Sequence, residues 1–386
     1  MRLLSLLFLL TGILIATAQS PRPARPISAA EARDFGEEIE REFKENGPDF
    51  FVKALDVARL VEIATAGQPG KDEIKDEFRA GVMKGGLGAN LAKGMEGFSS
   101  YKLLRAVATN ERPQLVFRCL TDAGALNYHI PELERPRGPR IRIVDIFVML
   151  TGEKLSETLR RPYLAAAAET DRSLLARLTQ GQGAWIKHGK DVQNLARLAR
   201  DGDSKAALKL FESLPESLRA EKSIMVLRLM AASKADEKGY LSVIEAFEKR
   251  FSNGPSLALV SIDGFVLKKQ THRAIAAIEK LDRFIGGDPF LLILQASQYV
   301  EMKEKDKALE LARKAMEQEP SLSNGYDFLL TFALEDKDYV ETVRLLNLTE
   351  KNLNVDMLKA VLDTKEYADF QESTAGKKWK EAHQAK

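Results

Sequence analysis

The chain has 386 residues, of which 45% are hydrophobic and 30% charged, a balance typical of a folded soluble protein rather than a disordered or polytopic membrane chain. The chain has 58 Lys and Arg and 56 Asp and Glu, which gives a formal net charge of +2. Nucleic-acid binders usually have a large excess of basic residues, so we expect no nucleic-acid partner. One Cys and four scattered His exclude a disulfide framework, and we predict no metal site and no cofactor. The length favours two domains.

The first 20 residues have the three parts of a secretory signal peptide. Arg2 supplies a positive charge, a short apolar run follows, and residues 16–18 (Ala-Thr-Ala) form an A-x-A cleavage site. The apolar run is shorter than the about 20 residues that cross a bilayer. We therefore expect cleavage of residues 1–18 after Ala18, a flexible leader over 19–30, and a periplasmic or secreted protein with no stable membrane span afterwards.

Residues 28–95 show helical patterns. Ser28 and Glu31 form a capping box, which predicts a helix that ends before Gly47 and Pro48. Two further helices are expected over roughly 49–64 and 71–95. Residues 81–97 are rich in Gly but contain neither a P-loop nor a dinucleotide fingerprint, so we interpret these glycines as sites of close helix packing.

After Gly97 the pattern changes to the alternation of β-strands. Four alternating runs, beginning near Tyr101, Leu115, Leu126 and Ile141, are separated by turn compositions at hairpin lengths. They predict a four-stranded antiparallel meander with the three helices across one face. The last strand is apolar on both faces, which predicts a central position in the sheet or cover on both sides. A helix from about 153 to 180, containing a proline, completes an α+β domain over 31–183.

Helices followed by a curved meander resemble the cystatin-like cone folds, including the nuclear-transport-factor and ketosteroid-isomerase superfamily, over about residues 30–155. The resemblance is architectural, and no catalytic motif of that group matches here, so its activities do not carry over. Residues 142–153 also resemble a segment of uncharacterised exported bacterial proteins with helical repeats.

Residues 184–386 have helical periodicity throughout and predict an all-α superhelix of helical hairpins with a C-terminal cap. The clearest unit begins at Pro289 and matches the 34-residue tetratricopeptide pattern of large, small and proline positions. The matching residues are Leu292, Ala296, Tyr299, Ala308, Ala312, Ala315 and Pro320. The resemblance implies stacked hairpins with a concave surface that binds a protein or peptide.

We therefore expect an exported, non-enzymatic scaffold or adaptor for a protein partner. A clamp for a peptide carboxylate would need several cations on the inner helices. Lys268, Lys269 and Arg273 lie near a helix end, and we interpret them as a solvated surface.

An alternative function is binding of a small ligand or lipid, or weak acid–base catalysis, in a pocket of the N-terminal domain. Its candidate residues are Tyr101, Tyr128, His129 and Asp145. A buried carboxylate such as Asp145 would have a raised pKa suited to proton transfer. His129 alternates to the face opposite Tyr128, however, and Asp145 could instead bond strand amides or an arginine such as Arg105 or Arg118. We favour structural roles for these residues.

Two further features have simple interpretations. The turn before the last strand is basic and contains Arg135, Arg137, Arg140 and Arg142. We expect a solvated turn there, and the alternative is contact with an acidic partner or a lipid headgroup. Cys119 lies on an alternating apolar face and is expected in the core.

Overall fold

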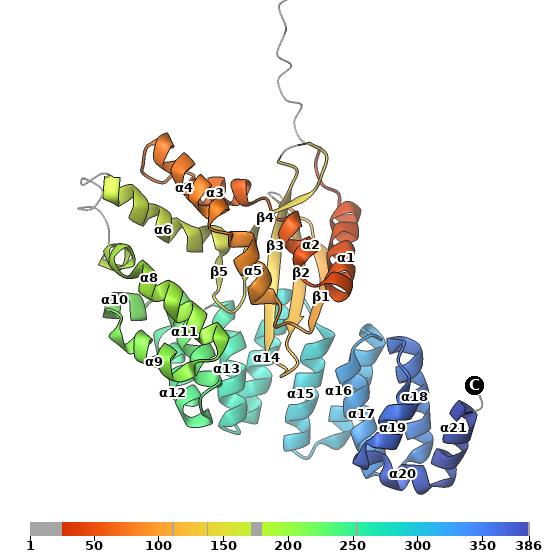
Figure 1. The fold of residues 1–386 in the computed structure, drawn as a ribbon. Helices are drawn as coiled ribbons and strands as arrows, with labels where there is room; N and C mark the ends of the chain where they lie inside the picture. The colour runs from red at the N-terminus through yellow and green to blue at the C-terminus, as the bar shows by residue number, and fades with distance from the viewer. Residues whose placement is uncertain (1–24, 110–111, 137, 171–179, 252–253, 385–386) are drawn as a thin grey trace, which may run out of the picture.

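A computed structural model describes residues 25–109, 112–136, 138–170, 180–251 and 254–384. The predicted signal peptide and most of the predicted leader lie outside these residues. An α+β unit built on one antiparallel sheet leads into an all-helical C-terminal half, which is the expected fold class (Figure 1). Among the described helices, none is both long and apolar enough to cross a membrane.

Helix α1 (Ala29–Asn46) begins at the predicted capping box. The Ser28 Oγ accepts a hydrogen bond from the Glu31 amide at 3.2 Å, and the Glu31 carboxylate accepts one from the Ser28 amide at 3.0 Å. The helix ends at Gly47, whose φ of 72° favours glycine. The first predicted helix is therefore confirmed at both ends.

Each of the next two predicted helices is divided in two. The first becomes α2 (Asp49–Ala54) and α3 (Val57–Thr65), because Leu55 leaves the helix and forms a parallel bridge with Ile143 of the sheet. The second becomes α4 (Asp72–Lys84) and α5 (Leu87–Met95), because Gly86 adopts a left-handed conformation between them.

The described residues form a five-stranded antiparallel sheet in the order β1-β2-β3-β4-β5. Its strands are β1 (Ser100–Val107), β2 (Gln114–Leu120), β3 (Leu126–Glu134), β4 (Arg142–Val148) and β5 (Glu153–Lys154). The four-stranded meander is confirmed. Strand β5, at the expected start of a helix, was not predicted, because two residues are too short for a periodic pattern.

Both faces of the sheet are covered. Helices α1, α2, α3 and α5 lie over one face, where side chains such as Leu115, Phe117 and Cys119 form a core with those helices. Alternate residues, including Val116 and Tyr128, form a second core with helices of the C-terminal half. In β4 the consecutive residues 143–146 are all buried, as its two-sided apolar pattern predicted.

Two long helices connect the sheet to the repeats. Helix α6 (Leu155–Thr170) contains Pro162 and packs against α3, and α8 (Gln180–Asp201) packs against α6. Residues 171–179, within the predicted helix over 153–180, lie outside the described ranges. The predicted boundary between residues 183 and 184 falls near the start of α8.

The C-terminal half repeats with a period of 34 residues. Helices α13, α15 and α17 begin at residues 255, 289 and 323, and α12, α14, α16 and α18 begin at residues 237, 271, 305 and 339. The helices from α9 to α18 are α9 (Ser204–Ser213), α10 (Glu216–Arg219), α11 (Lys222–Ser233), α12 (Glu237–Arg250), α13 (Pro255–Leu267), α14 (Thr271–Ile285), α15 (Pro289–Glu301), α16 (Lys305–Gln318), α17 (Ser323–Glu335) and α18 (Tyr339–Leu353). The array ends with α19 (Met357–Asp363), the 3₁₀ turn η1 (Lys365–Tyr367), α20 (Ala368–Glu372) and α21 (Thr374–Gln384).

The turn inside each hairpin repeats as closely as the helices do. Lys269, Lys303 and Lys337 occupy equivalent positions and have left-handed φ angles of 54°, 63° and 55°. The amide of each lysine donates to the carbonyl of the residue three positions before the lysine. The amide of the residue after each lysine donates to the carbonyl five positions before that residue. A helix end of this kind satisfies carbonyls that the last turn leaves open.

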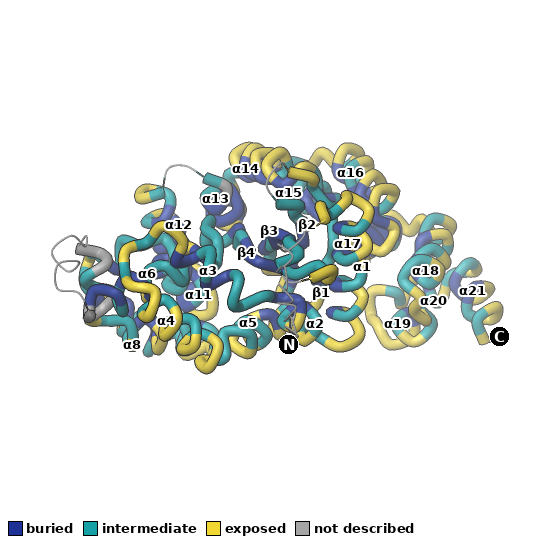
Figure 2. Tube along the Cα trace, turned by 90° about the horizontal axis from the view of Figure 1, so that it is seen from above, coloured by how far each residue is buried: buried dark blue, intermediate teal, exposed yellow. Residues whose placement is uncertain are grey.

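The small residues of the tetratricopeptide-like signature lie where two helices cross. Ala296, Ala308, Ala312 and Ala315 are completely buried between α15, α16 and their neighbours. Figure 2 shows the hairpins from α13 to α18 curving around the sheet.

Candidate functional site: surfaces of the helical array

The sheet docks on one edge of the array. In the shared core, the members from the array are Ala258, Leu259, Ile262, Ala277, Ile278, Leu281, Ile285 and Leu291. They lie in α13 up to its middle, in α14 from its middle onward and in the first turn of α15, on the side of the array where successive hairpins connect. This edge of the array is therefore covered by the chain itself.

A buried ionic cluster joins the sheet to two of these connections. Arg118 of β2 donates from Nη1 to Asp288 at 2.6 Å and from Nη2 to Glu319 at 2.6 Å. The Tyr128 hydroxyl donates to the second oxygen of Asp288 at 2.8 Å. Asp288 precedes α15 and caps it by accepting from the Phe290 amide, whereas Glu319 follows α16.

This cluster is almost completely removed from solvent, with Arg118 1% exposed and Asp288 3% exposed. Burial alone lowers the pKa of Arg118, but the hydrogen bond that Arg118 donates to Glu319 and the charges of both carboxylates outweigh burial, so the pKa is raised. Arg118 therefore stays charged and holds the two domains together.

The four candidate pocket residues of the N-terminal domain do not converge. Tyr101 and His129 are within hydrogen-bonding distance of one another, at 3.3 Å between the hydroxyl and Nδ1, in the core under the N-terminal helices. Tyr128 points to the array and Asp288. Burial raises the pKa of both tyrosines and lowers the pKa of His129 to about 4.

Asp145 finds its partners within its own domain. Its carboxylate accepts from the Ser156 hydroxyl at 2.5 Å, from the Ser156 amide at 3.1 Å and from the Ile146 amide at 2.9 Å. Burial raises the pKa of Asp145, although the bonds from Ser156 oppose this. Asp145 therefore has a structural role, but two of its three bonds come from Ser156 of α6 and one from a strand amide, that of Ile146. Arg105 and Arg118 instead contact the array.

The arginines of the β3–β4 hairpin have different environments. Arg135 bonds the carbonyls of Arg25 and Pro26 and the Glu31 carboxylate, so it fixes the start of the described chain. Arg142 donates to the Lys53 carbonyl at 2.8 Å, and Arg140 is exposed. Arg137 lies outside the described residues.

The first helix of each central hairpin has no cation. The sequences of α13, α15 and α17 contain no Lys or Arg, and their charged residues are Asp263, Glu301, Asp327 and Glu335. Lys268 pairs with Glu245 at 2.9 Å, and Arg273 stacks on the Phe265 ring at the α13–α14 turn. These helices therefore lack the cations of a carboxylate clamp.

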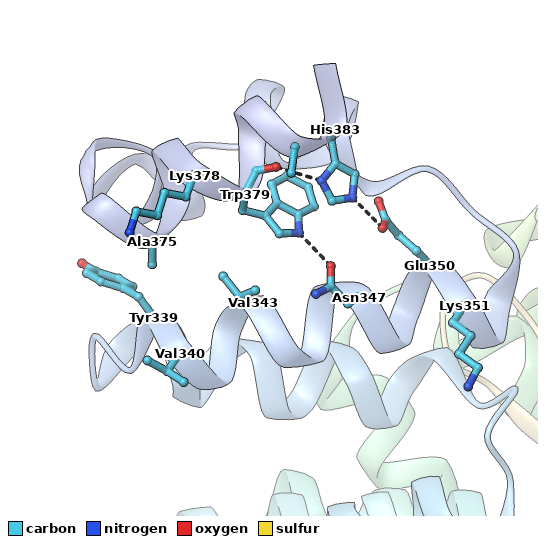
Figure 3. A pocket seen from close by; sticks show the side chains of 11 residues that line it. Tyr339, Val340, Val343, Asn347, Glu350, Lys351, Ala375, Lys378, Trp379 and His383 are labelled. Carbon is cyan, nitrogen blue, oxygen red and sulfur yellow. Dashed lines mark hydrogen bonds and ion pairs between the residues drawn. The ribbon is translucent and has the colours of Figure 1, made fainter. Parts of the chain in front are cut away.

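An apolar groove lies at the C-terminal end of the array, between α18 and α21 (Figure 3). Its cavity volume is about 880 Å³, and it is lined by Tyr339, Val340, Val343, Asn347, Glu350, Lys351, Ala375, Lys378, Trp379, Ala382 and His383. Val340 is 82% exposed, more than any other large apolar residue in the described part of the chain. The groove has the size of an ordinary ligand or peptide pocket.

Specific polar contacts hold the two walls of the groove together. The Trp379 indole donates to the Asn347 side chain at 3.0 Å, and His383 Nε2 contacts the Glu350 carboxylate at 2.8 Å (Figure 3). The Trp379 and His383 rings also pack together, with their centroids 4.0 Å apart. Since later residues of α21 meet later residues of α18, the two helices run in the same direction.

The sequence analysis did not find this groove. The sequence pattern predicts only a cap at the C-terminal end of the array. The available signal was the spacing of Ala375, Trp379 and His383 at four-residue steps, opposite Val343 and Asn347 on α18.

No protein-family model and no curated protein sequence matches this chain. Within the described ranges, no group of three or more His, Cys, Asp or Glu side chains could hold a metal ion.

Proposed function

We propose that the protein is an exported, non-enzymatic scaffold whose helical array holds a protein partner, and that the groove between α18 and α21 is a binding surface for this partner. The observation that carries the proposal is the groove itself, an open apolar trough with the 82% exposed Val340 at its rim. Helical repeats stack so that each hairpin covers the next, and terminal hairpins normally present a polar outer side. An apolar trough at the terminal hairpin is the kind of surface that takes a further helix.

The finer parts of the proposal rest on the sequence. The 34-residue spacing of the hairpins and the buried alanines of the signature support a relationship to tetratricopeptide repeats. The order of helices and meander supports a cystatin-like N-terminal domain. Export rests on the signal-peptide pattern of residues 1–18.

The test uses a displayed library of helical peptides, selected on the full mature chain. We expect the enriched peptides to bind the Val340→Asp variant at least tenfold more weakly, because a carboxylate replaces the exposed apolar rim. Val340 is the second residue of α18, where an acidic residue suits the helix N-terminus, so the variant should fold normally.

Val266→Asp is the matched control, since Val266 is another exposed valine, 42% accessible, on α13 away from the groove. Selected peptides should bind this variant as they bind the unchanged chain. Enriched peptides that ignore Val340→Asp, or a selection that enriches none, would contradict the proposal.

A further inference from the structure

We infer that the groove takes an amphipathic helix with acidic residues beside its apolar face, an inference that rests on the function proposed above. The first reason is the charge of the groove. Lys378 lies at the end near Tyr339, and Lys351 lies at the opposite end near Glu350 (Figure 3). Across the described part of the chain, neither lysine side chain forms a hydrogen bond or an ion pair.

Glu350 is the one acidic side chain among the residues that line the groove, and it is already paired. The Glu350 carboxylate accepts from His383 at one oxygen and from the Met357 amide at the other. Glu341, one turn into α18, forms a two-point pair with Arg344 at 2.6 Å. The charges left for a partner are therefore the two lysines, and a positive rim favours and orients an acidic ligand.

The shape and chemistry of the groove favour a helix over an extended peptide. Its walls are two helices, whose backbone groups bond internally, so they offer no strand edge to a ligand. An extended peptide on this apolar floor would leave its own amides and carbonyls without partners. A helix satisfies its backbone internally and can place an apolar stripe over Trp379 and Val343.

The same charges disfavour a second copy of the chain. Helix α21 carries Lys377, Lys378 and Lys380 against the single acidic Glu381. A two-fold pairing would place α21 of one copy against the same surface of the other. Two surfaces with the same excess of lysine charge would then meet, which opposes association.

The test compares two synthetic helical peptides that share one Leu- and Ala-rich face, with Glu flanking this face in one peptide and Lys in the other. We expect the full mature chain to bind the Glu peptide at least tenfold more tightly at low salt, and this preference to shrink as salt is added. The double variant Lys351→Glu/Lys378→Glu should reverse the preference.

The control is Lys280→Glu/Lys314→Glu, which makes the same change in net charge at exposed positions of α14 and α16 and should keep the preference for the Glu peptide. Equal binding of the two peptides, a preference for the Lys peptide, or a preference that survives in Lys351→Glu/Lys378→Glu would overturn the inference while leaving the groove as a binding site. A dimer in sedimentation equilibrium that Val340→Asp abolishes would also overturn it, in favour of a second copy. If neither peptide binds, the proposed function fails as well.

Discussion

Arg118 shows how one buried side chain can join two domains. Arg118 is 1% exposed, and its guanidinium contacts Asp288 and Glu319, which lie 170 and 201 residues further along the chain. A buried ion pair gains little over a well-packed apolar pair, but losing one partner leaves an uncompensated charge in the interior. The cluster therefore specifies how the sheet sits on the array more than it adds net stability.

The substitution Arg118→Met should lower the free energy of unfolding by about 3–5 kcal/mol, because Asp288 and Glu319 then lose their cation while still buried. Urea denaturation monitored by circular dichroism measures this change in the free energy of unfolding. Arg344→Met removes an exposed pair within α18 and should cost less than about 1 kcal/mol. A similar small loss for both variants would show that the Arg118 cluster is not buried in solution.

His129 should make the protein sensitive to mild acid. Burial lowers the pKa of His129 to about 4 from its ordinary value of 6.5, so the unfolded chain binds this proton more readily than the folded one does. Stability should therefore fall as the pH drops from about 6.5 to about 4, by roughly 3 kcal/mol from this residue.

His129→Gln should flatten that part of the stability–pH curve, as measured by urea denaturation at a series of pH values. His272→Gln makes the same change at an exposed position of α14 and serves as the reference. Parallel curves for the wild type and His129→Gln would contradict the assignment of a buried, neutral histidine.

Sequence alternation predicted which residues are buried better than it predicted their partners. The core position of Cys119 and the structural role of Asp145 agree with the expected roles, although Asp145 bonds mainly Ser156 of α6 rather than strand amides. The partners of Arg118 and Tyr128 could not be predicted, because they come from connections between hairpins more than 150 residues away. Local periodicity contains no information about such contacts.

At the scale of elements, the hairpin turns contain a repeated backbone strain. Lys269, Lys303 and Lys337 all have the left-handed conformation that glycine adopts at lower cost. The Lys303 side chain forms no hydrogen bond or ion pair with another described residue, so no contact of this side chain offsets the cost of its left-handed backbone.

Lys303→Gly should therefore raise the free energy of unfolding by about 0.5–1 kcal/mol, because it removes the steric cost of a Cβ in this conformation. Lys314→Gly, inside α16, should have the opposite sign and cost about 1 kcal/mol. Thermal denaturation of both variants gives the comparison. Destabilisation by Lys303→Gly would argue against a left-handed residue at this turn.

The elements themselves were mostly predictable. The capping box, the strand alternation and the 34-residue unit at Pro289 each depend on short-range patterns, and the helices and strands follow them. The divisions at Leu55 and Gly86 were missed for different reasons. The first depends on a bridge to Ile143, whereas the second is a local glycine turn inside an otherwise helical pattern.

At the scale of the whole molecule, the array has one covered edge and one open end. The sheet packs on the connections between hairpins, through the core that includes Tyr128 and Ile278 and through the Arg118 cluster (Figures 1 and 2). The groove between α18 and α21 lies at the far end of the array from α8. The N-terminal domain thus orients the array and leaves this end open for a partner.

The docked edge could not be predicted from the sequence, and the four-residue spacing of Ala375, Trp379 and His383 was only a local sign of the groove. The stacking of hairpins follows from the pattern of large and small residues in each repeat. The docking of the sheet on the array depends instead on which apolar faces remain exposed after the hairpins have stacked. The resemblance to helical repeats implied a concave binding surface, and it could not distinguish that surface from a groove at the end of the array.

The most direct test of the central claim is hydrogen–deuterium exchange of the full mature chain with and without a peptide selected from the helical library. Peptide binding should slow exchange in α18 and α21 and leave the sheet and α13 to α16 unchanged. Protection confined to the sheet, or to α13, α15 and α17 without α18 and α21, would show that the groove is not the binding surface.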